Sequence, residues 1–408
     1  MRIEEHTNWV AGRAQGPAEG HLFERVSHLA GGEPTGRWPR STAEDLAEAL
    51  EQTAAAAGDW RRRPRAERAA LLRGLPAAIA RQRDLAGSLG RALGLEVHEL
   101  SSRLDADLLE LARSLSANSA GAGEGPGDPG HGRGPQAAGE PGTGLFVAHW
   151  SDLVGGLAAG VGARLLDGAG VCVVSDPHLP EAAQALAGAL AEVLGPGPWS
   201  SVHTDLAGPL AAATRWDSLA WIRWRAPSEV LRAARAERGT RPATWELLPV
   251  VNASYVIPEA ADPAAEAALV VRQALGRSST LSGQFPGQVG RIYCHQRLFS
   301  RFSLQLLHLL EDAPDQPVPL VEDDLFEHVR RAWTIGLDEG ATPIFGGPPV
   351  RCTPLTLAPL VFTNVDVAGG LVDLERPAPI LGLCRVASDA EGRRLAAARG
   401  GPSWRPDR

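Results

Sequence analysis

The chain has 408 residues, enough for two or three domains at roughly 150 residues per domain. Its formal net charge is −8, and all 40 basic residues are arginine. Without lysine, the chain has no side chain for a Schiff base, for covalently attached pyridoxal phosphate or for a Walker phosphate loop. The acidic balance also argues against a nucleic-acid partner, because nucleic-acid binders gain affinity by neutralising phosphates.

Four cysteines are scattered along the chain without a CxxC pair: Cys172, Cys294, Cys352 and Cys384. This spacing predicts reduced thiols and no structural metal site. No apolar run approaches the roughly 18 residues of a membrane span, and the N-terminus lacks the basic and then apolar pattern of a leader. We therefore expect a cytoplasmic protein with no membrane partner. The usage of alanine, arginine and glycine is typical of GC-rich bacterial genomes.

Helical periodicity dominates the first part of the chain. We predict a helix over 42–58 capped by Thr42, a second over 64–95 with a break near Pro76, and a third over 96–116. Four arginines between positions 61 and 65 are interpreted as a solvated helix start rather than a polyanion site. Residues 117–143 are rich in glycine and proline and lack apolar periodicity, so they are predicted to form a flexible loop.

From residue 144 onward, short apolar strands alternate with helices. This order is typical of a doubly wound parallel sheet, with strands predicted over 145–149, 170–175 and 200–204 and helices over 151–166 and 181–194. The glycines between positions 155 and 162 do not follow the GxGxxG pattern of dinucleotide sites, and packing is the commoner explanation for them.

A second alternating section follows from about residue 244. Its predicted strands cover 255–257, 291–294 and 343–345, and its predicted helices cover 263–275, 299–310 and 323–332. We accordingly divide the chain into an N-terminal helical part, the loop, a Rossmann-like sheet and a second α/β domain, which span 1–116, 117–143, 144–248 and 249–408.

Several segments, in this order, resemble the aldehyde dehydrogenase superfamily over most of residues 40–390. They are DWRRRPRAERAALLR, the run from HWSDL to VVSDP, WELLP, SGQFPGQVGR, DEGATPIFGG and ERPAP. The resemblance implies an α/β fold with a doubly wound nucleotide-binding-type domain and a catalytic-type α/β domain. It also implies NAD(P)-dependent oxidation of an aldehyde through a thiohemiacetal on a cysteine.

The position of the catalytic cysteine is altered. The family nucleophile is the cysteine of a GQxC motif; here Gln284 matches, Arg291 is in register downstream, and the cysteine position is Pro286. Because proline offers no nucleophile, the covalent adduct that donates the hydride cannot form there. The nearest thiol, Cys294, precedes His295 in a predicted strand, where adjacent side chains face opposite sides. We interpret it as a buried or incidental cysteine.

Two further positions keep polar side chains. Glu246, in WELLP, falls on the family's general-base glutamate, and a carboxylate there could activate water. Leu248 and Pro249 replace the two glycines that follow in the family, so a structural role at the end of a strand carries equal weight. Ser151, in HWSDL, occupies the position of an asparagine that stabilises the oxyanion, and its hydroxyl can donate one hydrogen bond.

The positions that bind the dinucleotide in the family have also changed. Val174 replaces the ribose-binding lysine, and Ala226 and Leu231 replace glycines of the turn that admits the pyrophosphate. Glu375 matches the glutamate that holds the nicotinamide ribose. We expect no cofactor, and NAD(P) only if the family function is retained.

The resemblance also bears on assembly. Family members continue past the ERPAP position and pair subunits through a terminal strand and a hairpin, whereas this chain stops at Arg408 and the hairpin position falls within 117–143. This implies a truncated catalytic-type domain with unfinished sheet edges. We expect a protein partner or a different homo-oligomer to cover them.

These residues leave three functions open. The first is a non-catalytic binding or scaffolding subunit that has lost aldehyde oxidation. The second is a cofactor-independent enzyme of specialised metabolism that acts on a small carbonyl or acyl compound in the old cleft, with Glu246 as base and with Ser151 and residues 282–286 as lining. The third is an active NAD(P)-dependent aldehyde dehydrogenase. Whether the chain is an enzyme stays open at the level of sequence.

Overall fold

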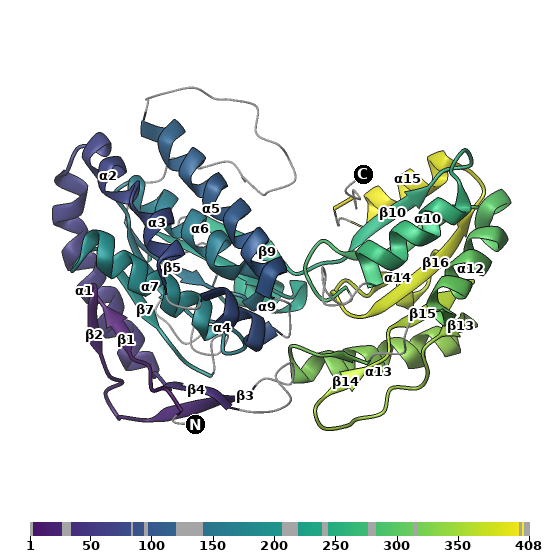
Figure 1. Cartoon of the computed structure of the whole chain (residues 1–408), viewed down its shortest axis with the longest axis horizontal. Helices are drawn as coiled ribbons and strands as arrows, with labels where there is room; N and C mark the ends of the chain where they lie inside the picture. Colours follow the sequence, from purple (N-terminus) through teal and green to yellow (C-terminus); the bar gives the residue numbers. More distant parts are fainter. Residues whose placement is uncertain are drawn as a thin grey trace. The chain divides into compact units, whose positions relative to one another are not determined.

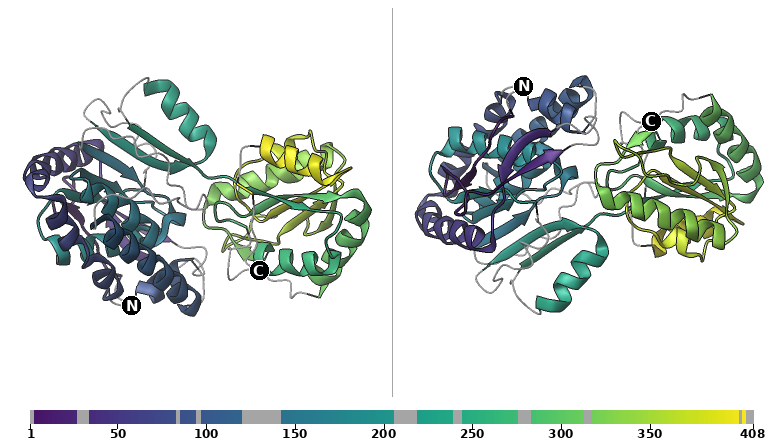
Figure 2. Two further views of the ribbon diagram at one scale, coloured as in Figure 1. Left: turned by 90° about the horizontal axis from the view of Figure 1, so that it is seen from above. Right: turned by 90° about the horizontal axis from the view of Figure 1, so that it is seen from below.

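A computed structural model describes residues 3–26, 34–82, 85–93, 97–119, 142–205, 219–238, 244–275, 283–312, 317–399 and 402–403. The chain divides into two compact α/β units, with the boundary between Pro249 and Val250 (Figure 1). Figure 2 shows helices on both faces of the sheet in each unit. The predicted flexible loop over 117–143 lies outside the described residues, apart from its ends.

Four short strands at the N-terminus were not predicted from periodicity. The hairpin of β1 (Asn8–Val10) and β2 (Arg13–Gln15) extends the first sheet, because β1 pairs antiparallel with a central strand. The hairpin of β3 (Leu22–Val26) and β4 (Pro34–Pro39) pairs only with itself among the described strands. Strands this short carry too few alternations for a periodicity signal.

The predicted helix cap at Thr42 is confirmed. Helix α1 (Ala43–Arg62) begins with a capping box in which the Thr42 hydroxyl accepts from the Asp45 amide and the Asp45 carboxylate accepts from the Thr42 amide. The helices that follow break near Pro76, as expected; they are α2 (Arg65–Leu72), α3 (Leu75–Ala80), α4 (Leu85–Leu93) and α5 (Val97–Ser119). The surface arginines of this region form ion pairs, namely Arg62 with Asp59, Arg63 with Glu67 and Arg65 with Asp167.

The first sheet has the strand order β2-β1-β7-β6-β5-β8-β9, and the five strands from β7 to the edge strand β9 are parallel. They are β5 (Thr143–Val147), β6 (Gly170–Val174), β7 (Trp199–Val202), β8 (Trp221–Ala226) and β9 (Thr244–Pro249). The chain first runs outward from β5 to β7 and then returns to β8 on the other side of β5. The predicted doubly wound sheet is confirmed, and its reversal point lies between β5 and β8.

Helices cover both faces of this sheet. One face packs on α1 and α9 (Ser228–Arg238) through a core that includes Leu46, Leu145 and Leu231. The other face lies against α6 (Leu153–Leu166) and α7 (Pro180–Leu194), and a single 3₁₀ turn, η2 (Trp150–Asp152), connects β5 to α6.

The glycines of α6 allow close packing. A Cβ atom at Gly155 would lie 2.2 Å from the Cβ of Asp107 on α5, and one at Gly160 would lie 2.5 Å from the Phe146 ring on β5. Both distances are too short for real carbon contacts. Because these glycines have no side chain, α6 can pack closely against both α5 and the sheet.

The second sheet has the order β10-β11-β16-β15-β13, parallel except for β13. Its strands are β10 (Ala253–Ile257), β11 (Val289–His295), β13 (Thr342–Phe345), β15 (Leu360–Thr363) and β16 (Ile380–Val386). One face packs on α10 (Pro263–Val270), the π-helical turn η4 (Val271–Leu275) and α12 (Gln296–Glu311). The other packs on α13 (Asp323–Asp338), α14 (Gly370–Asp373) and α15 (Asp389–Ala398). A small ladder of β12 (Val318–Pro319) and β14 (Thr356–Leu357) completes the unit.

All four cysteines are free, and three of them lie buried in strands. Burial raises the pKa of Cys172, Cys294 and Cys384 to about 12. Across the described ranges, no helix is long and apolar enough to span a membrane. The same residues contain no group of three or more metal-binding side chains.

Candidate functional site

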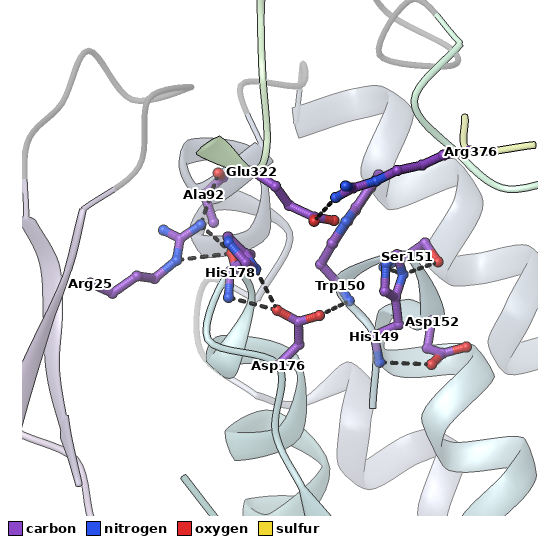
Figure 3. Close-up of polar contacts among 10 residues, drawn as sticks. All are labelled: Arg25, Ala92, His149, Trp150, Ser151, Asp152, Asp176, His178, Glu322 and Arg376. Atoms are coloured by element: carbon purple, nitrogen blue, oxygen red, sulfur yellow. Dashed lines mark hydrogen bonds and ion pairs between the residues drawn. The ribbon is translucent and has the colours of Figure 1, made fainter. Parts of the chain in front are cut away.

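The loop after β5 places a serine against a histidine. The Ser151 Oγ lies 2.7 Å from the Nδ1 of His149, and the Ser151 backbone N–H donates to the same nitrogen at 3.2 Å (Figure 3). Because Nδ1 accepts this N–H, the ring proton of a neutral His149 sits on Nε2. The Ser151 hydroxyl is then the donor to Nδ1.

Two carboxylates fix the backbone of this loop. Asp152 Oδ2 accepts the His149 N–H at 3.0 Å, and Asp176, which follows β6, accepts the Trp150 N–H at 2.8 Å (Figure 3). The other oxygen of Asp176 accepts the His178 N–H at 2.8 Å and lies 2.9 Å from its ring nitrogen. The loops after β5 and β6 are thus tied together at the carboxyl edge of the sheet.

Backbone strain marks the start of α6. Leu153, two residues after Ser151, has φ 43° and ψ 180°, a conformation that side chains with a Cβ rarely adopt. Such strain persists only where the surrounding contacts hold it. Here the flanking hydrogen bonds of Asp152 fix the turn.

An ion pair crosses the reversal point of the sheet. Asp152 Oδ1, after β5, lies 2.7 Å from the Nε of Arg225 near the end of β8. The Asp152 side chain is buried and that of Arg225 is partly exposed. Because open α/β sheets bind ligands where the strand order reverses, this pair stands at the expected crevice of the first unit.

The hairpin β3–β4 is anchored to the same edge by Arg25. The Nε of this buried side chain donates to the His178 carbonyl at 3.0 Å and one Nη donates to the Ala92 carbonyl at 3.2 Å (Figure 3). Glu181 lies 3.4 Å from the other Nη. Burial lowers the pKa of Arg25, and the charges of Glu181 and Asp176 oppose that effect.

Glu246 is paired with two arginines. It lies opposite Arg223 in the register of β8 and β9, and their side chains form an ion pair. Its other oxygen lies 3.4 Å from Arg164 Nη2 on α6. Both carboxylate oxygens are therefore engaged. Glu246 also lies three residues before the end of β9 at Pro249, or about 10 Å along the strand.

The three altered cofactor positions belong to the apolar core between the sheet, α1 and α9. Val174 is 0% exposed, Ala226 6% and Leu231 5%. Their side chains provide no hydrogen-bond donor for a ribose or a phosphate. These three positions do not fit the dinucleotide that the family binds.

In the second unit, Gln284 joins two loops. Its buried amide donates to the Pro319 carbonyl at 2.9 Å and accepts the Val321 N–H at 3.0 Å. Pro286 follows in the same loop, half-buried, next to buried Phe285. The Gly287 N–H donates to the Val251 carbonyl at 2.9 Å, which ties this loop to the start of β10. Ser282 lies outside the described residues.

The Glu375 segment is held through its backbone. Asn252 donates its N–H to the Glu375 carbonyl at 2.6 Å and its side-chain amide to the Arg376 carbonyl at 3.1 Å. The buried Arg291 donates to the Val372 carbonyl at 2.8 Å. Arg376 forms an ion pair with Glu322 (Figure 3). Hydrogen bonds thus hold the segments around Asn252, Gln284 and Glu375.

Cys294 and His295 do not form a pair of catalytic side chains. Cys294 lies in the apolar core beside α10 and α12, where burial raises its pKa to about 12. The His295 ring instead caps α12 by accepting the Arg297 N–H at 3.3 Å. This agrees with the prediction that the Cys294 thiol is buried.

Sequence reasoning missed several residues of the first unit, including His149, Asp176, Arg164, Arg223 and Arg225. The sequence did contain a signal for Arg223 and Arg225, because alternate residues of a strand lie on the same face of the sheet. Arg223 and Arg225 therefore had to lie on the same side of β8.

A profile of the aldehyde dehydrogenase family matches residues 17–399, and the chain belongs to this family. The fold agrees. A lactaldehyde dehydrogenase structure has a TM-score of 0.83 and 17% identity, covering 97% of this chain and 84% of that chain. An NAD-dependent aldehyde dehydrogenase from Sinorhizobium meliloti has a TM-score of 0.79 and 18% identity, covering 97% and 80%. Succinate-semialdehyde dehydrogenase from Burkholderia pseudomallei has a TM-score of 0.78 and 23% identity, covering 96% and 82%. A comparison with curated protein sequences gives no match.

Proposed function

We propose that this member of the aldehyde dehydrogenase family has lost NAD(P)-dependent aldehyde oxidation. The observation that carries the proposal is Pro286, which stands at the position of the family's nucleophilic cysteine. The reaction needs a thiolate on which the hydride-donating adduct forms. The nearest thiol in sequence, that of Cys294, is buried in the core.

The cofactor and base positions support the same proposal. The buried alkyl side chains of Val174, Ala226 and Leu231 offer no hydrogen bond to a dinucleotide. Each oxygen of Glu246 is paired with an arginine, and two positive charges beside the carboxylate stabilise its ionised form and weaken it as a base.

In this proposal the chain acts in the cytoplasm of a bacterium as a binding or scaffolding subunit. A protein partner or a second copy of the chain covers its open sheet edges. The hydrogen bonds of Gln284 and Asn252 support this role, because they hold the loops of the second unit although residue 286 is proline.

A second candidate is a cofactor-independent enzyme that acts on a small carbonyl or acyl compound. The observation that favours it is the contact of 2.7 Å between Ser151 Oγ and His149 Nδ1 at the carboxyl edge of the first sheet. A hydroxyl that donates to an imidazole is the arrangement from which nucleophilic catalysis starts. In this candidate function the two arginines hold Glu246 in place, and Ser151 is the residue that reacts with the substrate.

Calorimetric titration with NAD and NADP tests the loss of aldehyde oxidation, which both candidate functions assume. We expect no binding at millimolar cofactor and no reduction of NAD(P) with a panel of aldehydes. A matched variant, Pro286→Cys, restores only the thiol, and we expect it to stay inactive because the cofactor positions are unchanged. Micromolar binding together with aldehyde-dependent reduction of NAD(P) would instead establish an active dehydrogenase.

A further inference from the structure

One pair of side chains in the first unit has the geometry of a nucleophile and its base. His149 is buried, Ser151 is half-buried, and their 2.7 Å contact falls within the range of a catalytic hydrogen bond. The backbone N–H of Ser151 points to the same Nδ1 atom at 3.2 Å. This second contact fixes the ring orientation, and the backbone N–H and the hydroxyl share the single lone pair of Nδ1.

The pair also lies where the fold presents ligands. It follows β5, whose carboxyl end borders the reversal of strand order between β5 and β8. Hydrogen bonds from His149 to Asp152 and from Trp150 to Asp176 fix the loop backbone on both sides of the ring. The strained turn at Leu153 comes next in the chain. A pre-organised loop of this kind is what nucleophilic catalysis requires.

We propose that Ser151 is a nucleophile for acyl transfer and His149 its general base, so that the chain hydrolyses activated esters or thioesters without a cofactor. The inference rests on the second candidate of the proposed function and goes beyond it, because it names the reacting atoms and the substrate class.

The reaction balances with these two groups and water. The Ser151 Oγ attacks the acyl carbon and its proton passes to His149 Nδ1, while the bond from the acyl carbon to the leaving oxygen or sulfur breaks. The leaving group takes the proton from Nδ1. A water molecule then attacks the acyl-serine and returns its proton through the same nitrogen, which releases the carboxylic acid and restores the hydroxyl.

The test follows acylation of the full chain by 4-nitrophenyl acetate. The background is Cys352→Ser, because Cys352 is an exposed thiol that would react with the same reagent. We expect release of 4-nitrophenolate and an acetyl group that peptide mass spectrometry locates on Ser151. Acetylation confined to other residues, or a rate no faster than that of the urea-unfolded chain, would overturn the proposal.

Two variants separate catalysis from helix capping. Ser151→Ala should abolish the mapped adduct. His149→Asn keeps a side-chain oxygen that can cap the Ser151 N–H but removes the base, so the rate should fall roughly 100-fold with the melting temperature retained. An unchanged rate in His149→Asn would reject His149 as the base.

These readouts do not involve a dinucleotide. A failure of the acylation test therefore leaves the proposed loss of aldehyde oxidation untouched. Binding of NAD in the calorimeter would likewise not decide whether Ser151 is acylated, because mass spectrometry measures that separately.

Discussion

Arg223 on β8 and Glu246 on β9 face each other across two parallel strands in register, and their side chains form an ion pair. A second arginine, Arg164 on α6, approaches the other oxygen of the same carboxylate. Glu246 is thus built into the contact between the sheet and α6. Its surroundings suit a structural role.

Removing this charge should therefore lower stability. In Glu246→Gln, Arg223 would keep its largely buried positive charge without a carboxylate partner, and we expect a loss of about 1–3 kcal/mol in the free energy of unfolding. Urea unfolding followed by circular dichroism measures it. Glu110→Gln, at an exposed position of α5, is the control and should change stability by less than about 0.5 kcal/mol. Equal stabilities of the two variants would contradict the structural role.

Neighbouring glycines of α6 should respond to alanine with opposite signs. Gly155→Ala places a Cβ atom 2.2 Å from the Cβ of Asp107, so overpacking should cost about 1–3 kcal/mol despite the better helix propensity. At Gly156 the nearest atom would lie 3.9 Å away, and Gly156→Ala should gain about 0.5–1 kcal/mol. Thermal and urea unfolding of both variants measure these changes in the free energy of unfolding. A stabilising Gly155→Ala would show that α5 and α6 are not packed as described.

Acid should destabilise the first unit through His203. This fully buried ring lies 2.9 Å from the Ser175 hydroxyl and 3.2 Å from the Gln184 side-chain oxygen, and it packs against the Trp38 ring. Burial, together with the nearby His6, lowers the pKa of His203 to about 3. Below about pH 6.5 the unfolded chain binds a proton that the folded chain does not, so stability is full above that pH and falls as the pH drops towards 3.

The size of this effect can be measured between pH 7 and pH 5. We expect His203 alone to contribute about 2 kcal/mol of lost stability over that interval. Burial lowers the pKa of His6 as well, so its contribution has the same sign. His203→Gln removes the titrating group, and its unfolding free energy should depend less on pH than that of the parent protein. Identical pH dependence in both proteins would rule out a buried neutral His203.

Among the four thiols, only Cys352 should react with Ellman's reagent in the folded protein. It is exposed, and hydrogen bonds with Thr356 lower its pKa, whereas burial raises the pKa of Cys172, Cys294 and Cys384 to about 12. Because the thiolate is the reactive form, the reaction of the folded protein with the reagent should have a fast phase from Cys352. That fast phase should be absent in Cys352→Ser. Guanidinium chloride should then expose the remaining thiols. A fast phase that persists in Cys352→Ser would mean that a strand cysteine is accessible.

The local elements were largely determined by the sequence. Thr42 with Asp45 three residues later is a capping signal that acts within one turn, and the structure has that cap. The alternation of short apolar strands with helices required parallel strands joined by crossovers, and the doubly wound sheet follows from it. The identity of residue 286 as proline, which carries no thiol, is likewise given by the sequence alone.

The tertiary structure decided which side chains meet. Arg164 and Arg223 lie 82 and 23 positions from Glu246, so no local pattern could pair them with it. The same holds for Gly155 and Asp107, which lie close together only because α5 packs on α6. Ser151 and His149 are neighbours in sequence, yet their hydrogen bond depends on a turn that distant Asp176 helps to hold. Sequence specifies local backbone preferences and covalent chemistry, whereas partners in space depend on strand register and helix packing, which the whole chain sets together.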